Sequence, residues 1–428
     1  MAGGCDYLVL YWVMFASVDF SRRFPILCVL ALALGAAIAL GISRFAYTMF
    51  LPLMRDDLHW SYFISGNMNT ANAIGYLIGA LTCNQLFQRF GLSKLFFVCM
   101  WLTVFLIAAS GFSTHSSVIF MIRFLVGITC TYVFVSGGVL AAKIGALHPH
   151  QSGWILGIYY GGVGFGVLLS SIFVNPLNQW AIEHAYLHPW QEAWFGMALL
   201  SACLALLCLI PTRSLNFSVD PVHSQQKISL ALIWPMYVSY FTYGIGYIGY
   251  MTFSVALVRE IGFSGSRLSY FYGLVGLFMM LSSVIWSKQL DRQKGGFVLG
   301  AVCLVLGAAS LIPAGISLYV EPQAVLAWHV MAIFASAMLF GSSMVTAVSA
   351  TTAFVKHNFP ARDWVYGIRI FTIAFALGQI VGPFIVGYIS DAYGGLGIGL
   401  LFSAGILFLA SVIGFLQKPI ASTKPVHL

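Results

Sequence analysis

Apolar runs long enough to cross a lipid bilayer recur along the whole chain. A spanning helix needs about 20 mostly apolar residues. Of the 428 residues, 60% are hydrophobic and only 7% are charged, whereas a soluble globular chain carries about 25% charged residues. The composition therefore indicates a membrane protein. We predict twelve spanning helices, over residues 25–53, 61–87, 94–112, 116–142, 151–174, 191–211, 230–257, 267–288, 297–319, 324–355, 363–389 and 396–416.

The longest polar stretch separates the sixth predicted helix from the seventh. It reads PTRSLNFSVDPVHSQQK, from Pro211 to Lys227. We therefore predict an all-α membrane protein with twelve transmembrane helices in two six-helix halves. Its predicted parts are an N-terminal cytoplasmic or interfacial segment (1–23), the first half (24–211), a central cytoplasmic loop (212–228), the second half (229–417) and a cytoplasmic tail (418–428).

The positive charges predict how the helices are oriented. Of the 20 Lys and Arg residues, 14 lie in segments that are cytoplasmic if the N-terminus is, and three lie in the external loops. Because cytoplasmic loops are enriched in Lys and Arg, we expect a multi-pass protein of the inner (plasma) membrane with both termini in the cytoplasm. The remaining three, Arg44, Arg123 and Arg369, fall inside predicted helices.

Two similar segments support the division into halves. The second predicted helix ends in NQLFQRFG (Asn84–Gly91), and the eighth ends in SKQLDRQKG (Ser287–Gly295). Each helix leaves the membrane through an arginine, Arg89 or Arg292, with a glycine after it. Two repeated helical halves are typical of secondary transporters, whose binding site lies where the halves meet.

Two GxxxG patterns stand at related positions of the halves. Small residues at this spacing let helices pack closely. We expect these glycines to permit close packing as the halves move. The residues are Gly162 and Gly166 in the fifth helix, and Gly378 and Gly382, followed by Pro383, in the eleventh.

The loops and the first helix resemble those of the major facilitator superfamily. The superfamily loop reads about G-x-x-x-D-R-x-G-R-[KR]. The first copy keeps Arg89 and Gly91 but lacks the acidic residue, and the second keeps Asp291 and Arg292. GISRFAYTMFLPLM (41–54) is similar to the G-x-G-R-F-A-Y-T-x-L-L-P-x-M start of the bacterial YbfB/YjiJ group. The resemblance implies a twelve-helix transporter that works by alternating access, with these loop residues in conformational roles.

Arg44 is the leading candidate for a substrate contact. An ionisable residue inside a membrane segment usually faces a cavity, and a guanidinium can hold a carboxylate or phosphate through two parallel hydrogen bonds. Pro52 follows eight residues later; Arg44 resembles in this spacing the phosphate-binding arginine of the superfamily's organophosphate/phosphate antiporters. The alternative is a structural arginine that pairs with backbone carbonyls, Asp56 or Asp57.

Other polar and aromatic side chains are candidates for the same site. Arg123 resembles an arginine that, within the superfamily, is typical of proton-coupled antiporters. Five tyrosines of the seventh helix, spaced 3, 3, 4 and 3 residues apart, share one face. For all of these residues the alternative is a role in helix packing. The predicted substrate-binding set is Arg44, Tyr47, Asn69, Asn72, Arg123, Tyr240, Tyr243 and Gln379.

Acidic residues are missing from the predicted membrane interior. All 12 Asp and Glu residues fall in loops or at helix ends. A multidrug/proton antiporter typically uses a buried carboxylate for the proton and for a cationic drug, so the distribution argues against cationic drug efflux. The chain also lacks a phosphate-cradling Gly-Lys-Ser/Thr loop, which argues against ATP as the driver, and its cysteines show no metal-ligand spacing.

These observations predict a non-enzymatic secondary transporter that moves a small organic solute by alternating access. We favour an anion as this solute. The alternative is a drug or metabolite efflux transporter with a broad apolar cavity. The expected partners are a small-molecule substrate and the lipid bilayer, and the coupling ion is left open between a proton and another ion. We expect no cofactor, metal or nucleic acid, and a monomer.

Overall fold

A computed structural model describes residues 23–212, 215, 229–360 and 363–420. These residues are nearly all helical, and no strand occurs among them. The first membrane segment is built of α3 (Pro25–Ala36), the π-helix η1 (Ala37–Phe45) and α4 (Tyr47–Leu58). The other long helices are α5 (Tyr62–Phe90), α6 (Leu92–Ala109), α7 (Ser116–Leu147), α8 (Ser152–Glu183), α9 (Pro189–Thr212), α10 (Leu230–Glu260), α11 (Ser266–Arg292), α12 (Phe297–Tyr319), α13 (Ala327–Asn358), α14 (Trp364–Ala392) and α15 (Leu396–Phe415).

The all-α membrane fold is confirmed. Within the described ranges, 11 helical segments are long and apolar enough to cross a membrane. The further long helix is α5, which contains four asparagines, Asn67, Asn69, Asn72 and Asn84. Every predicted segment corresponds to one of these helices; most ends differ by five residues or fewer, but α8 continues to Glu183, nine residues past the predicted end. The segments predicted at 1–23, 212–228 and 418–428 lie mostly outside the described residues, so these parts of the division stay predictions.

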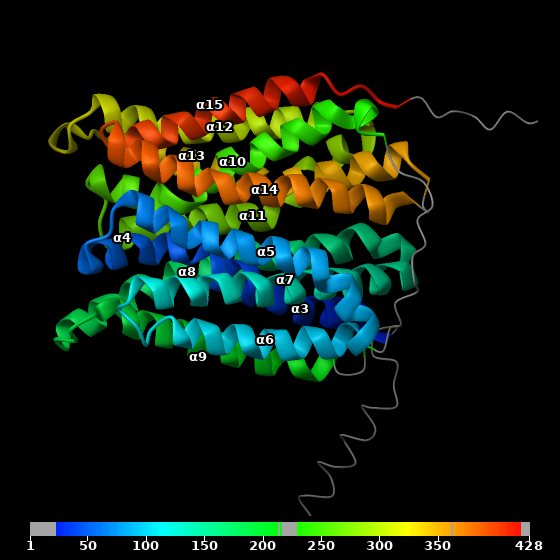
Figure 1. The fold of residues 1–428 in the computed structure, drawn as a ribbon, viewed down its shortest axis with the longest axis horizontal. Coiled ribbons are helices and arrows are strands. Elements are labelled where there is room, and N and C mark those ends of the chain that lie inside the picture. The colour runs from blue at the N-terminus through cyan, green and yellow to red at the C-terminus, as the bar shows by residue number, and fades with distance from the viewer. Residues whose placement is uncertain (1–22, 213–214, 216–228, 361–362, 421–428) are drawn as a thin grey trace, which may run out of the picture.

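The helices form two groups that lie one above the other in Figure 1, α3–α9 below and α10–α15 above. We call them the first and the second group. They meet where α5 packs on α14, where α8 packs on α11 and where α4 packs on α10. At two of these meeting places the backbones touch through glycine. A Cβ added at Gly66 would lie 2.3 Å from the Pro383 carbonyl oxygen, and one at Gly164 would lie 2.5 Å from the Gly276 carbonyl oxygen.

The GxxxG glycines lie inside the groups. A Cβ at Gly162 would lie 2.2 Å from the Ala33 carbonyl oxygen, so α8 packs here on α3. A Cβ at Gly378 would lie 2.2 Å from the Phe241 carbonyl oxygen, so α14 packs on α10. Gly166 and Gly382 make similar contacts with η1 and α10. A part in movement stays a prediction for these four, whereas Pro383 lies at a contact between the groups.

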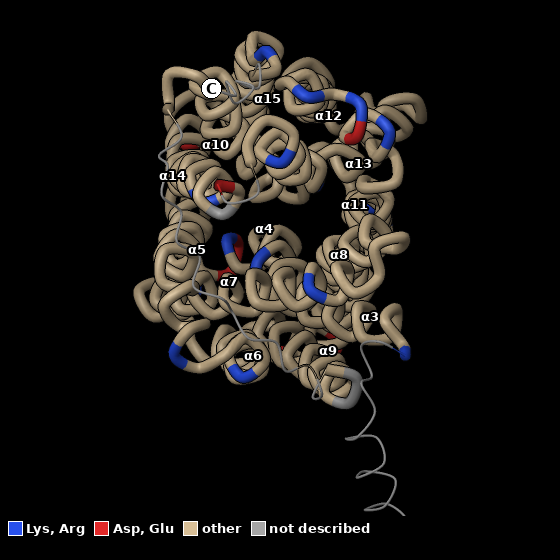
Figure 2. Tube along the Cα trace, turned by 90° about the vertical axis from the view of Figure 1, so that its right-hand side faces the viewer, with Lys and Arg blue, Asp and Glu red and all other residues tan. Residues whose placement is uncertain are grey.

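Helix α3 starts at one end of the bundle, and helix α15 finishes at that same end (Figure 1). The distribution of Lys and Arg along the sequence predicts that this end is cytoplasmic. Figure 2 looks onto it, and segments that carry Lys and Arg lie around its rim. Arg89, Asp291 and Arg292 are exposed there, and Gly91 ends α5 with a φ of +79°. We call the opposite end, where α4 ends and α5 begins, the predicted external end.

Candidate functional site

The first membrane segment departs from α-helical geometry at the residues that precede and include Arg44. Residues Ala37–Phe45 form a π-helix, and the Ala46 amide donates to the Gly41 carbonyl, five residues earlier, at 3.0 Å. Such segments are rare and occur frequently at functional sites. A Cβ at Gly41 would lie 2.5 Å from Gly166 Cα, so α8 packs tightly against this segment. The π-helix therefore lies in a closely packed environment.

Arg44 points from the π-helix toward the second group. Its Nη2 donates a 2.9 Å hydrogen bond to Oε1 of Gln379 on α14, and the Gln379 amide nitrogen donates to the Tyr247 hydroxyl on α10. The guanidinium lies 5.0 Å from the centroid of the Tyr76 ring, within cation–π range. Arg44 is only 3% exposed and Gln379 only 1%. The predicted candidates Arg44 and Gln379 thus contact each other directly, across the two groups.

Arg123 lies beside this contact and holds the backbone that carries Arg44. Its Nη1 donates to the Ser43 carbonyl at 2.7 Å, and its Nη2 donates to the Arg44 carbonyl at 3.3 Å and to Asn69 Oδ1 at 2.8 Å. Asn69 in turn donates to Thr252 of α10 at 2.8 Å. Arg123 therefore contacts the π-helix and, through Asn69, is connected to the second group. Arg44, Gln379, Tyr247, Arg123, Asn69 and Thr252 form what we call the central cluster.

Tyr47 and Asn72 lie next to the central cluster and bond to backbone groups. Tyr47 donates to the Ser65 carbonyl at 3.0 Å, and the Arg123 guanidinium lies 4.6 Å from its ring centroid. Asn72 donates to the Arg123 carbonyl at 3.0 Å, which joins α5 to α7. These bonds fit the helix-packing alternative, and a direct substrate contact stays a prediction for both residues.

The tyrosines of α10 form a stack of rings. The Tyr240 and Tyr243 ring centroids lie 5.6 Å apart, those of Tyr243 and Tyr247 lie 4.8 Å apart, and Phe375 of α14 packs against all three. Tyr243 also donates to the Met344 carbonyl at 2.7 Å. Sequence spacing placed these tyrosines on one face, but only the structure shows Tyr247 as the ring that reaches Gln379.

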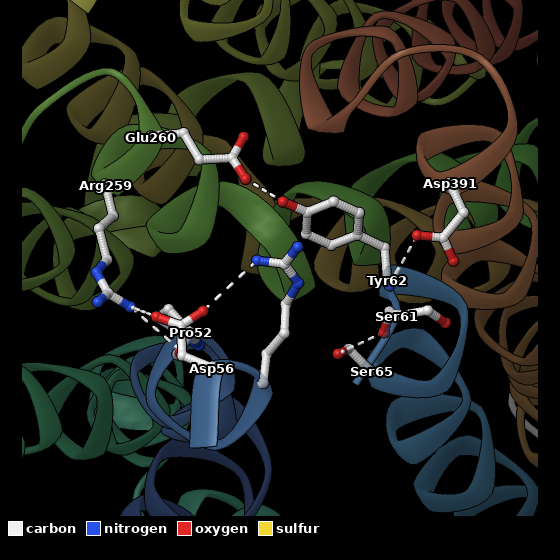
Figure 3. A network of polar contacts seen from close by, with 9 residues as sticks. Pro52, Asp56, Ser61, Tyr62, Ser65, Arg259, Glu260 and Asp391 are labelled. Atoms are coloured by element: carbon white, nitrogen blue, oxygen red, sulfur yellow. Dashed lines mark hydrogen bonds and ion pairs between the residues drawn. The ribbon is translucent and has the colours of Figure 1, made fainter. Parts of the chain in front are cut away.

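A second set of polar residues joins the groups at the predicted external end (Figure 3). Arg259 Nη1 lies 2.7 Å from Asp56 Oδ2, and Tyr62 donates to Glu260. Asp391 accepts from the backbone amides of Tyr62 and Phe63 at 3.0 and 2.8 Å, and thereby caps the start of α5. We call Asp56, Tyr62, Arg259, Glu260 and Asp391 the external polar network. These residues come from four helices that are separated in the sequence, and no common motif links them.

Asp56 and Asp57, the carboxylates nearest to Arg44 in the sequence, bind other partners. Asp56 pairs with Arg259, and Asp57 Oδ2 accepts from His188 Nδ1 at 2.7 Å and from Trp190 Nε1 at 2.6 Å. The alternative in which Asp56 or Asp57 pairs with Arg44 is therefore wrong. Within the described part of the chain, neither Arg44 nor Arg123 forms an ion pair with a carboxylate.

A family model described as "Uncharacterised MFS-type transporter YbfB" matches residues 36–415, which include η1 and both helix groups. The chain belongs to this family. The family is one of transporters of the major facilitator superfamily, and the described helices form the two groups given above.

The fold is also that of solved transporters of the superfamily. A bacterial homolog of the human lysosomal transporter Spinster, in an inward-facing and unoccupied conformation, matches with a TM-score of 0.70 and 14% identity, over 94% of this chain and 97% of the other. The nucleoside transporter NupG matches with a TM-score of 0.64 and 13% identity, over 94% of this chain and 100% of the other.

Two sequence relatives from Agrobacterium vitis are each named "Putative tartrate transporter". One is 25% identical over 159 residues and the other 23% identical over 175 residues. Each alignment covers 37% of this chain, and the chain spans about a third of the length of these relatives, 33% and 34%.

Proposed function

We propose that this protein is a secondary transporter that moves a small organic anion across the cell's inner membrane by alternating access, with both termini in the cytoplasm. The anion binds at the central cluster, and Arg44 is its main contact. The two helix groups then move against each other so that the site opens to one side of the membrane and then to the other.

The observation that carries this proposal is a pair of buried arginines with neutral partners. Arg44 and Arg123 are 3% and 1% exposed, and their described hydrogen-bond acceptors are an amide, two backbone carbonyls and another amide. A buried charge is costly unless it is paired. An anionic ligand would supply the missing negative charge, and a guanidinium binds a carboxylate through strong, charge-assisted hydrogen bonds.

The named relatives point to the same class of ligand. Tartrate is a small hydroxylated dicarboxylate, and the two relatives carry that substrate in their names. The tyrosine hydroxyls and the amide of Asn69 would offer partners for hydroxyl groups. Tartrate is therefore the first anion to test, beside simple dicarboxylates, aromatic carboxylates and inorganic phosphate.

Purified protein should show a higher unfolding temperature with at least one anion of this panel, and proteoliposomes should take up the same anion. We expect Arg44→Ala to abolish binding and Arg44→Lys to weaken it strongly, because an ammonium cannot form the two parallel bonds. Arg267→Ala is the matched control, because Arg267 is an exposed arginine at the start of α11. Normal uptake by Arg44→Ala, or no anion that stabilises the unaltered protein, would refute the proposal.

A further inference from the structure

Gln379 lies between Arg44 and Tyr247, at the contact between the helix groups. Its Oε1 accepts from Arg44 Nη2 at 2.9 Å, and its amide nitrogen donates to Tyr247. An arginine can only donate, so the oxygen of the side-chain amide has to face Arg44 and its nitrogen has to face the tyrosine hydroxyl. The side chain is thus fixed by both neighbours and lies 1% exposed in the middle of the bundle.

We propose that Gln379 is a displaceable placeholder for the carboxylate of the substrate. This inference rests on the proposed function, because it requires that an anion binds at Arg44. An amide oxygen has the shape of a carboxylate oxygen but no net charge. Gln379 therefore satisfies one donor of Arg44 and leaves its positive charge uncompensated. A carboxylate replaces it because it brings the opposite charge and can accept two parallel hydrogen bonds from the guanidinium.

Displacement of Gln379 would also act on the contact between the helix groups. Arg44 belongs to the first group, and Gln379 and Tyr247 belong to the second. When the carboxylate takes over Arg44, one hydrogen bond between the groups in the middle of the bundle is released. Ligand binding and the freedom of the groups to move are thus coupled through a single side chain.

The identity of residue 379 consequently sets the charge that the site accepts. A glutamate at this position fits both neighbours, because its two oxygens accept from Arg44 and from the Tyr247 hydroxyl, which can turn its proton toward them. The resulting internal ion pair would neutralise Arg44 and repel an incoming anion. A methionine has a similar length, no acceptor of comparable strength and no charge, so it leaves Arg44 free.

The test compares Gln379→Glu and Gln379→Met with the unaltered protein, using the anion of the panel that gives the largest thermal shift. We expect Gln379→Glu to fold, to unfold at a higher temperature than the unaltered protein without anion, and to bind the anion about 100-fold more weakly. We expect Gln379→Met to unfold at a lower temperature without anion, to bind at least as tightly as the unaltered protein, and to show a larger thermal shift with it.

Gln289→Glu is the matched control, because it adds the same charge at an exposed position of α11, and it should leave binding unchanged. Binding by Gln379→Glu within about threefold of the unaltered protein would overturn the placeholder role. Loss of binding in folded Gln379→Met would overturn it too, since Gln379 would then be a direct ligand of the substrate. Both results leave the proposed function intact as long as Arg44→Ala still fails to bind.

Discussion

The two sets of polar contacts that join the helix groups differ in how they balance charge. In the external polar network, Arg259 meets Asp56 at 2.7 Å, and both side chains are about half exposed, at 41% and 50%. In the central cluster, Arg44 and Arg123 are almost completely buried and bond to neutral oxygens. The Asp56–Arg259 pair thus balances charge where water can screen it, whereas the two central arginines have no carboxylate partner where a charge costs most.

This difference separates two tasks. Exposed ion pairs contribute little free energy, about 0–1 kcal/mol, which would suit contacts that break and re-form in the proposed movement of the groups. A buried guanidinium without a carboxylate gains much more from an anion that enters the site. The external polar network is therefore suited to hold one arrangement of the groups weakly, and the central cluster is suited to bind the ligand.

The largest effect should come from removing Arg123. In Arg123→Met, the carbonyls of Ser43 and Arg44 and Oδ1 of Asn69 lose their donor, and each unsatisfied buried acceptor costs about 1–3 kcal/mol. We expect a loss of at least about 3 kcal/mol of folding free energy and weaker anion binding, because the backbone of Arg44 is no longer held. Thermal unfolding in detergent and a binding titration measure both.

The control for this variant is Arg369→Met. Arg369 is also a helical arginine, in α14, but it is exposed, so its removal leaves no buried acceptor behind. If Arg369→Met and Arg123→Met lower the unfolding temperature equally, the hydrogen bonds of Arg123 do not stabilise the π-helix.

A smaller effect is expected from the external polar network. Asp56→Asn removes the ion pair with Arg259 and should shift the balance of states by about 0.5–1 kcal/mol, which corresponds to about two- to fivefold. Ser65 is fully buried, one turn into α5. A membrane-impermeant thiol reagent should label Ser65→Cys about two- to fivefold faster when Asp56→Asn is also present, with the exposed Cys203 replaced by Ala.

The labelling experiment also needs a variant that changes charge elsewhere. Glu183→Gln removes an exposed carboxylate at the end of α8, outside the external polar network, and it should leave the labelling rate of Ser65→Cys unchanged. Equal rates in the Asp56→Asn and unaltered backgrounds would show that the ion pair does not help to keep the predicted external end closed.

The smallest effect should be that of salt. At about 1 M salt the screening length falls to about 3 Å, so the Asp56–Arg259 pair weakens. Labelling of Ser65→Cys should then rise by up to about twofold. The rise should disappear in Asp56→Asn, which lacks the pair. A salt effect of the same size in Asp56→Asn would assign it to some other contact.

The membrane helices and the candidate residues could be predicted from the sequence, because apolar length and isolated polar residues are local signals. The contact between Arg44 and Gln379 could not, since these residues lie 335 positions apart. The rejected partner Asp56 follows Arg44 by 12 residues, about 18 Å along a helix. Helical rise alone argues against that pairing. No local sequence pattern predicts the π-helix, whose carbonyl oxygens accept hydrogen bonds from Arg123 on another helix.

The glycines show the same limit. The GxxxG spacing identified Gly162 and Gly378 as positions of close packing, and the structure places both in close contact with a backbone. The spacing does not say which helix is the neighbour. Gly66 and Gly164, which lie where the two groups meet, belong to no pattern that the sequence analysis used. Which glycine lies at the contact between the groups depends on the three-dimensional arrangement.

The neutral pairing of Arg44 also affects how the protein is inserted into the membrane, because the chain is synthesised from its N-terminus. Arg44 enters the bilayer with the first membrane segment, long before Gln379 is made. An arginine at the centre of an inserting helix costs about 2.5–3.5 kcal/mol. The segment that carries it, Pro25–Leu58, is the most apolar of the 11 described candidates and also among the longest, at 34 residues. Its run of Ala, Leu and Ile before Arg44 offsets the charge during insertion, until the later helices arrive.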